Sequence, residues 1–244
     1  MTHKTWSRKY PWHIIILIDQ SIFMVGENAD KAAECVQNTI FDIVASCIHG
    51  ECILDCVFIT VIGYGRKDQP VNIIRQGWVS EWAEDVLKAK LTGDNIIPAI
   101  ADCWGTPMTE AFKLAKECLD WWIQEREKES LLMGTSIVLN ITCGVPDDEL
   151  SAIVAAQEIL ETNTSCGKVL LFNAHMYDEN EKLVYPSERT DLRGNSRAEF
   201  LFDISSPLTD MMVNILQCFG FETIRHRARG YITNPKVVRF KFFG

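Results

Sequence analysis

The run from Trp12 to Ile18, Trp-His-Ile-Ile-Ile-Leu-Ile, constrains the fold of this chain more than any other segment. It is apolar apart from one histidine, it is rich in β-branched residues, and Asp19 follows it directly. Such a run is typical of a strand that is buried on both faces of a parallel sheet. It is too short to span a bilayer, which takes ~18 apolar residues, so we expect no membrane insertion.

Similar apolar runs recur along the chain and alternate with segments of helical periodicity. A short run at 71–75 follows the turn at 66–70 and suits an antiparallel edge strand. The alternation predicts an α/β, doubly wound, Rossmann-like fold, with a mostly parallel central sheet, one antiparallel edge strand and helices on both faces. The further strands are expected at 55–64, 135–142 and 167–173, and the helices at 28–48, 81–90, 107–129 and 147–162.

The sequence contains no repeat, no low-complexity run and no linker that would divide it. We therefore expect a single domain over residues 1–244, with a core over about residues 12–173 and a C-terminal extension over about residues 174–244. The extension is expected to hold a polar excursion at 175–195, a helical region at 197–219 interrupted near Pro207, and a tail at 231–243 that pairs as a strand or simply packs.

Charge and cysteine content argue against several function classes. The 244 residues include 24 Lys plus Arg and 33 Asp plus Glu, which gives a formal charge of −9. Binding to nucleic acid relies on clustered Lys and Arg that face phosphates, so we expect no nucleic-acid partner. The nine cysteines include no Cys-x-x-Cys pair, which favours buried, reduced thiols in a cytoplasmic protein over a disulfide framework or a zinc site.

Binding sites in open α/β sheets lie beyond the carboxyl ends of the strands. The loops expected there are 19–26 and 143–146, joined by 104–109 if its helix starts on the same side. These loops supply Asp19, Ser21 and Thr106, a carboxylate and two hydroxyls that suit a hard divalent cation such as Mg²⁺. The same residues also have structural explanations: Asp19 and Ser21 can satisfy loop N–H groups, and Thr106 can be a helix N-cap.

Three motifs, in this order, resemble the von Willebrand factor type A (vWA) family. They are Asp-Gln-Ser at 19–21, Gly-Thr-Pro-Met at 105–108 and Thr-Cys-Gly-Val-Pro-Asp at 142–147. The family signature is a metal-ion-dependent adhesion site, written Asp-x-Ser-x-Ser, then Thr, then Asp. The Gly-Thr-Pro-Met form is similar to that of bacterial cytosolic members. The resemblance implies metal ligands at Asp19, Ser21 and Thr106.

Two positions depart from that signature. Phe23 stands where the family has its second Ser, and Cys143 stands where it has its last Asp. Mg²⁺ requires near-octahedral oxygen coordination, and a thiol is a soft ligand that does not replace a carboxylate. We therefore expect a degenerate site with weakly bound Mg²⁺ or none, unless Asp102, Asp147 or Asp148 substitutes for the missing acid.

The resemblance implies a non-enzymatic module that binds a partner protein through the loops at the carboxyl ends of the strands. Its bacterial relatives imply kinase or phosphatase components of stress or defence systems as partners. The expected partner-binding residues are Trp104, Phe23 and Cys143, with Trp104 as an aromatic anchor. Two alternatives stay open: an Mg²⁺-dependent binding switch of the adhesion type, and an enzyme that uses Cys143 as nucleophile and His175 as base.

Overall fold

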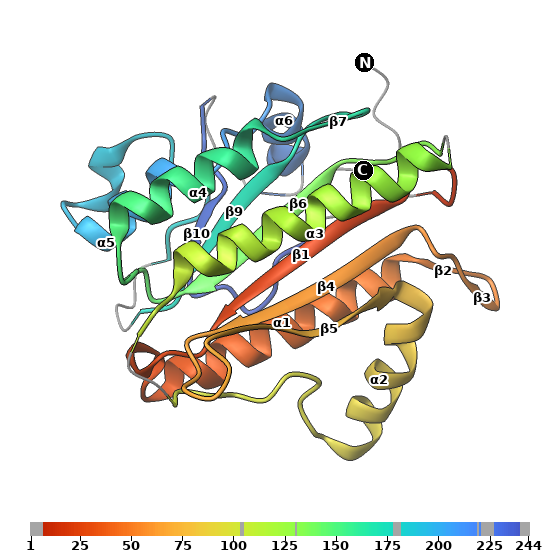
Figure 1. The fold of residues 1–244 in the computed structure, drawn as a ribbon, viewed down its shortest axis with the longest axis horizontal. Coiled ribbons are helices and arrows are strands. Elements are labelled where there is room, and N and C mark those ends of the chain that lie inside the picture. Colours follow the sequence, from red (N-terminus) through yellow and green to blue (C-terminus); the bar gives the residue numbers. More distant parts are fainter. Residues whose placement is uncertain are drawn as a thin grey trace.

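A six-stranded sheet forms the centre of the computed structural model, which describes residues 7–102, 105–129, 131–177, 182–218, 220 and 227–239. The strand order is β10-β9-β6-β1-β4-β5 (Figure 1), and every neighbouring pair is parallel except β4 and β5. This arrangement confirms the predicted mostly parallel sheet with an antiparallel edge strand. The strands are β1 (Trp12–Asp19), β4 (Val57–Tyr64), β5 (Val71–Trp78), β6 (Ser136–Thr142), β9 (Leu170–His175) and β10 (Tyr231–Thr233).

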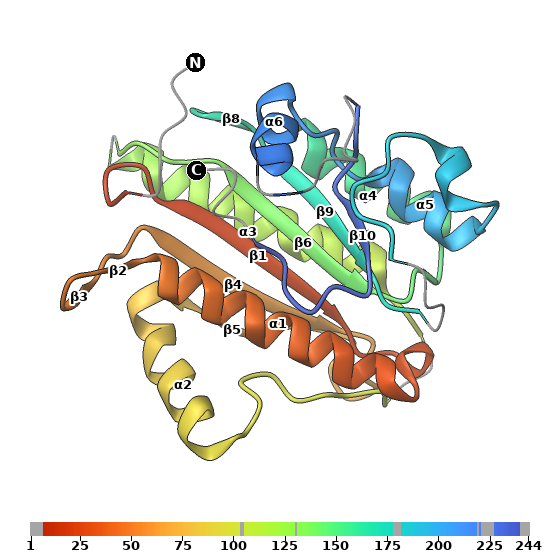
Figure 2. The same cartoon turned by 180° about the vertical axis from the view of Figure 1, so that it is seen from behind.

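Helices cover both faces of the sheet, as predicted (Figures 1 and 2). One face packs against α1 (Glu27–Ser46), α2 (Val79–Thr92) and α6 (Asp210–Cys218). The other face packs against α3 (Met108–Lys128), α4 (Glu149–Glu161) and α5 (Ser196–Ile204). The remaining elements are short: β2 (Ile48–His49), β3 (Cys52–Ile53), β7 (Asn163–Thr164), β8 (Gly167–Lys168), η1 (Ile22–Met24) and η2 (Arg189–Leu192).

Strand β1 is central because its side chains alternate between two apolar cores. Ile14, Ile16 and Ile18 belong to the core under α1, whereas Ile15 and Leu17 belong to the core under α3 and α4. Each of these side chains is at most 2% exposed. A strand without a polar face can only lie between two helical layers, which explains why this run occupies the middle of the sheet.

The C-terminal extension continues the sheet. Residues 231–233 form β10, which pairs in parallel with β9, so the tail contributes a strand. Helices α5 and α6 are separated around Pro207, as predicted from the sequence. Arg229 belongs to the basic run at 225–229, and its guanidinium donates hydrogen bonds to the carbonyls of Asp203 and Ser205 at the end of α5 (3.0 and 2.8 Å). This arginine therefore holds the extension together.

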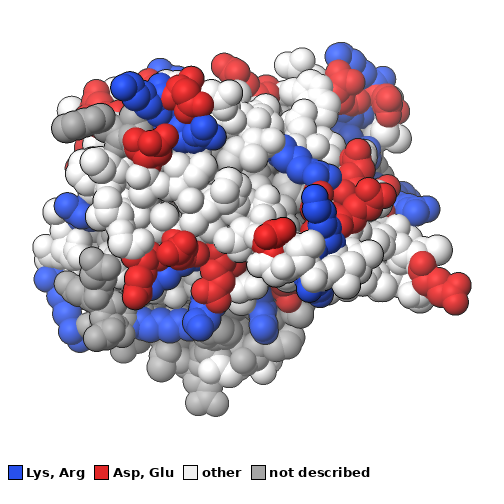
Figure 3. Space-filling view, turned by 90° about the horizontal axis from the view of Figure 1, so that it is seen from below, with Lys and Arg blue, Asp and Glu red and all other residues white. Residues whose placement is uncertain are grey.

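The surface carries charges of both signs. On the side drawn in Figure 3, Lys and Arg side chains lie interspersed with Asp and Glu side chains, and uncharged areas separate them. Within the described part of the chain, no helix combines the length and the apolar character that crossing a membrane requires.

The eight described cysteines are free thiols. Five of them are buried and two, Cys52 and Cys218, are exposed. The Sγ atoms of Cys47 and Cys56 lie 3.2 Å apart. The prediction of buried, reduced thiols therefore describes most of these cysteines, with the exposed Cys52 and Cys218 and the half-buried Cys166 as exceptions.

Candidate functional site at the carboxyl end of the sheet

Asp19 ends β1 and is fully buried between the carboxyl ends of β4 and β6. Its Oδ1 accepts a hydrogen bond from the backbone N–H of Ser21 at 2.9 Å. Its Oδ2 accepts from the Thr142 hydroxyl at 2.7 Å and from the Cys143 backbone N–H at 3.4 Å. Burial raises the pKa of the Asp19 carboxyl above its usual value, and these hydrogen bonds oppose the rise. The carboxyl group thus ties the loop after β1 to the end of β6.

Ser21 and Thr106 are fully buried, and their hydroxyls have no hydrogen-bond partner among the residues that the structure describes. The expectation that Thr106 caps the following helix is wrong, because α3 begins at Met108 and the Thr106 side chain caps no N–H group. Instead, the Thr106 backbone N–H donates to Asp147 Oδ1 at 2.7 Å, and the Asp147 N–H donates to the Thr106 carbonyl at 3.1 Å. The loop before α3 is therefore joined to the loop after β6.

The three acids considered as substitutes lie in different environments. The Asp147 carboxylate contacts Thr106 as described above. Asp148 is the N-cap of α4, where it accepts from the backbone N–H and the hydroxyl of Ser151 (3.2 and 2.8 Å). Asp102 approaches the first loop through its backbone N–H, which donates to the Gln20 carbonyl at 3.2 Å. Asp147 is thus the acid whose carboxylate lies beside a predicted ligand.

The donors at this end of the sheet fit a divalent cation only in part. The unpartnered hydroxyls of Ser21 and Thr106 are groups that a metal would satisfy. Both oxygens of Asp19, however, already accept hydrogen bonds, and the remaining family positions hold an aromatic ring and a thiol. Within the described ranges, no three His, Cys, Asp or Glu side chains are grouped to hold a metal ion. The set falls short of a six-oxygen shell, and weak or absent Mg²⁺ binding stays a prediction.

Cys143 and His175 lie together, but not as a nucleophile and its base. The His175 Nε2 is 3.1 Å from the backbone carbonyl oxygen of Cys143, and its Nδ1 is 2.8 Å from the Tyr231 hydroxyl. The Cys143 thiol is 3.5 Å from Asp19 Oδ2. Burial lowers the pKa of His175 to about 4, while burial and the Asp19 carboxylate raise the pKa of the thiol. His175 is therefore not positioned as a base for the Cys143 thiol.

A buried hydrogen-bond chain supports this end of the sheet, and our sequence reading missed it. The Tyr64 hydroxyl donates to Asn140 Oδ1 at 2.8 Å, and Asn140 Nδ2 donates to Asn173 Oδ1 at 2.9 Å. Asn173 Nδ2 then donates to the Ser205 hydroxyl at 2.9 Å. All four residues are fully buried. The sequence did contain a signal for this chain of hydrogen bonds, namely an asparagine within each of two apolar strands. A side-chain amide buried in this way requires hydrogen-bond partners.

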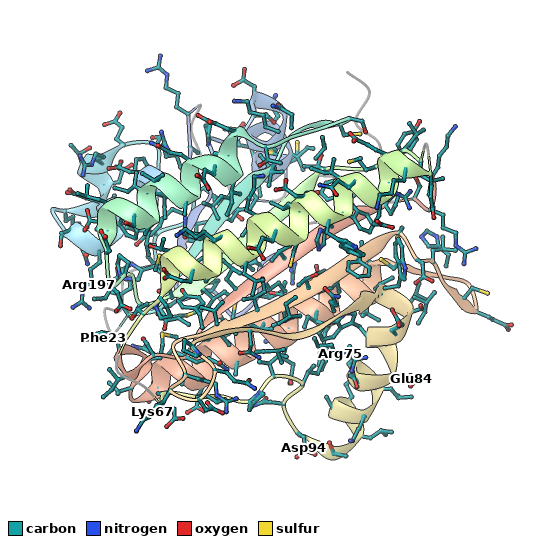
Figure 4. The ribbon with its side chains drawn as sticks, in the orientation of Figure 1. Phe23, Lys67, Arg75, Glu84, Asp94 and Arg197 are labelled. Atoms are coloured by element: carbon teal, nitrogen blue, oxygen red, sulfur yellow. The ribbon has the colours of Figure 1, made fainter. Side chains whose placement is uncertain are left out.

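A cavity of about 500 Å³ opens beside Cys143 and His175; we call it the rim cavity. It lies between the loop after β1, the end of β9 and the start of α5. Phe23 and Val25 line it and are 43% and 57% exposed. Phe23 and Arg197 are found at this end of the molecule in Figure 4. Of the predicted partner-binding residues, Phe23 is therefore accessible, Cys143 is buried in the cavity wall, and Trp104 lies outside the described residues.

No protein-family model and no curated protein matches the sequence of this chain. Among solved structures it is similar to the pilus adhesin SpaC from Lactobacillus rhamnosus GG (10% identity, TM-score 0.53, 83% of this chain and 28% of that chain covered). It is also similar to proximal thread matrix protein 1 from the mussel byssus (12%, 0.49, 82% and 43%) and to manganese-loaded Plasmodium vivax TRAP protein (15%, 0.40, 68% and 57%). The chain spans less than two thirds of each of these chains. At this identity, the likeness to SpaC shows the fold alone.

Proposed function

We propose that this chain is a non-enzymatic interaction module of the vWA type with a degenerate metal site, which binds a partner protein at the carboxyl end of its sheet. The observation that carries the proposal is an exposed apolar lip beside the rim cavity. Ile22, Phe23 and Val25 are 39%, 43% and 57% exposed on one short loop. Exposed apolar groups on a loop that a rigid sheet holds in place are typical of recognition surfaces.

The three motif segments support the vWA assignment. Segments 19–21, 105–108 and 142–147 lie far apart in the sequence, yet hydrogen bonds connect them at one end of the sheet. The fold neighbour SpaC is a pilus adhesin, and we extend to this chain a binding role but not a ligand. A bacterial cytosolic setting with kinase or phosphatase partners belongs to the same proposal and rests on the Gly-Thr-Pro-Met form at 105–108.

A second candidate is the metal-dependent binding switch. The buried hydroxyls of Ser21 and Thr106, both without a partner among the residues described, are the observation in its favour. Asp147 would be the substitute acid, because it already contacts the backbone of Thr106. In this version a divalent cation would change the affinity for the partner, whereas the leading proposal requires no cation.

The test is capture of the partner from native-cell lysate, followed by an affinity measurement with the purified partner. The variant Phe23→Ser with Val25→Ser removes the lip, and Leu91→Ser is the matched control, because Leu91 is 78% exposed at the far end of α2. We expect the lip variant to weaken binding by about fivefold or more and the control to leave it unchanged. Equal affinity for all three proteins would overturn the proposal. Binding that EDTA abolishes and Mg²⁺ restores would establish the second candidate instead.

A further inference from the structure

The rim cavity has a single fully charged side chain in its described lining, that of Arg197. The His175 imidazole in the cavity wall is neutral near pH 7, because burial lowers its pKa to about 4. Asp19 lies 3.5 Å behind the Cys143 thiol and does not line the cavity. The cavity is therefore electrostatically positive at the position of Arg197.

Arg197 is available to a ligand. Among the described residues its guanidinium forms no ion pair and no hydrogen bond, and the side chain is exposed. It belongs to the first turn of α5, whose N-cap Asn195 accepts from the Ala198 N–H at 3.1 Å. The positive end of the helix dipole thus adds to the charge of the guanidinium.

A buried amide points to the second requirement of the ligand. Asn28 is 6% exposed at the start of α1 and lines the rim cavity. Its Oδ1 accepts no hydrogen bond from any residue in the described part of the chain. A buried acceptor without a donor is costly, so a ligand that brings an N–H group would be favoured here.

The third requirement is apolar contact. Phe23 and Val25 form the exposed lip, and the fully buried side chain of Met176 contributes to the wall. The volume of the rim cavity, about 500 Å³, lies within the range of pockets that hold small ligands or a few side chains. The exposed lip continues outside the cavity to Ile22. The parts of a ligand that remain outside the cavity would cover this side chain.

We propose that the rim cavity binds an internal peptide segment of a partner protein in which an Asp or Glu side chain stands next to a large apolar residue. The acidic side chain accepts hydrogen bonds from Arg197, a peptide N–H donates to Asn28 Oδ1, and the apolar residue packs against Phe23 and Val25. This inference rests on the proposed function and names the chemistry of the partner. One arginine beside an apolar lip matches a single carboxylate better than a polyanion such as nucleic acid, which is recognised by clustered cations.

The experiment uses two blocked dipeptides, Ac-Phe-Asp-NH2 and Ac-Phe-Asn-NH2, titrated into the full chain and followed by amide chemical shifts. The peptides differ only in the charge of one side chain. We expect the aspartate peptide to bind about fivefold more tightly to the wild-type protein, since an exposed ion pair contributes modestly to affinity. In Arg197→Gln the two affinities should become equal, because the variant removes only the charge-dependent part of binding.

Two further variants complete the design. Arg8→Gln is the matched control, because Arg8 is an exposed arginine near the amino end of the sheet, and it should preserve the fivefold preference. Phe23→Ser should weaken both peptides to the same extent and leave their ratio unchanged. Amide spectra of each free variant verify that the fold is retained.

Several results would overturn the inference. They are equal affinities of the two peptides for the wild type, a preference that survives in Arg197→Gln, and absence of binding at the highest soluble peptide concentration. Tighter binding of inorganic phosphate, or of the free acid Ac-Phe, at the same resonances would assign the cavity to a phosphate group or to a chain terminus instead. The proposed function is tested separately, by the affinity of the captured partner protein for the variant Phe23→Ser with Val25→Ser.

Discussion

At the amino end of the sheet face covered by α3, the imidazole of His13 lies among aromatic rings, whereas at the carboxyl end of the same face Asn140 lies in a chain of hydrogen bonds. The ring centroid of His13 is 5.5 Å from that of Phe58 and 5.2 Å from that of Trp122. Its Nε2 is 2.9 Å from the Thr60 hydroxyl, but its Nδ1 has no partner among the described residues. At the other end, the oxygen and the nitrogen of the Asn140 amide are both bonded.

The comparison separates two ways of burying polar groups. A satisfied network is strong and geometrically specific, so that loss of one member leaves others unpaired. A polar group packed among rings contributes mainly apolar contact, so that an apolar substitute of similar shape is tolerated. The satisfied network lies next to the loops that form the candidate site, which is the part of the molecule where precise positioning matters.

Acid should weaken both regions together. The pKa of His13 is lowered to about 3 and that of His175 to about 4 by burial, against 6.5 for an exposed histidine. Below pH 6.5 the unfolded chain therefore binds protons that the folded chain does not, and stability falls as pH decreases towards 4. Each histidine should cost ~2 kcal/mol at pH 5 relative to pH 7. Urea unfolding at both pH values measures the difference.

The raised pKa of Asp19 acts in the opposite direction, because the folded state binds that proton more readily as pH falls. A loss of stability from pH 7 to pH 5 that is the same in His13→Phe and in His175→Phe as in the wild type would contradict the assignment of the two histidines as neutral.

Asn140→Ala should break the carboxyl-end network. The substitution leaves the Tyr64 hydroxyl without its acceptor and Asn173 Oδ1 without its donor, at full burial. We expect a loss of ~3 kcal/mol in the free energy of unfolding. Asn163→Ala is the matched control on the exposed strand β7 and should cost less than ~0.5 kcal/mol. A loss below ~1 kcal/mol for Asn140→Ala would show that the network contributes little.

Restoring the family residues at positions 23 and 143 should increase the affinity for divalent metal ions at the site next to that network. The wild-type protein is expected to bind Mg²⁺ and Mn²⁺ weakly or not at all in calorimetric titration. Phe23→Ser with Cys143→Asp should bind at least ~10-fold more tightly, because it adds a hydroxyl and a carboxylate to the available oxygens. Without metal this variant should be less stable, since the new carboxylate adjoins Asp19, and Mg²⁺ at 100 times its Kd should restore ~2.7 kcal/mol.

Asp19→Asn in that double variant is the control and should abolish the gain. Clear micromolar binding of Mg²⁺ by the wild-type protein, lost in Asp19→Ala, would show instead that the present residues form a working site.

His13→Phe should have the smallest effect. The ring keeps its contacts with Phe58 and Trp122, and only the hydrogen bond to Thr60 is lost. The free energy of unfolding at pH 7 should change by no more than ~1 kcal/mol, and the loss at pH 5 should be roughly halved. His175→Phe is the contrasting variant, because His175 bonds with both ring nitrogens and its replacement should cost more. Equal costs for the two variants would remove the distinction drawn above.

Local patterns were sufficient to predict the sheet, and also the segments that meet at its end. The β-branched run at 12–18 forms the central strand, and 71–75 falls within the antiparallel edge strand β5, which extends three residues further to Trp78. These predictions succeed because burial on two faces and helical periodicity are properties of neighbouring residues. The expected helix at 107–129 is found at Met108–Lys128, but the predicted N-cap role of Thr106 was wrong. The backbone N–H of Thr106 donates instead to Asp147, 41 residues further along the chain.

The sequence by itself determined the order of the strands and helices, the apolar core of β1 and the loops that carry Asp19, Thr106 and Cys143. Only the tertiary structure decided which groups those loops present. It paired His175 with the Cys143 carbonyl instead of the thiol, and it placed Arg197 beside Phe23 at one cavity. The physical reason is that a side-chain partner depends on strand register and on the packing of elements distant in sequence, and neither is encoded in the local pattern of residues.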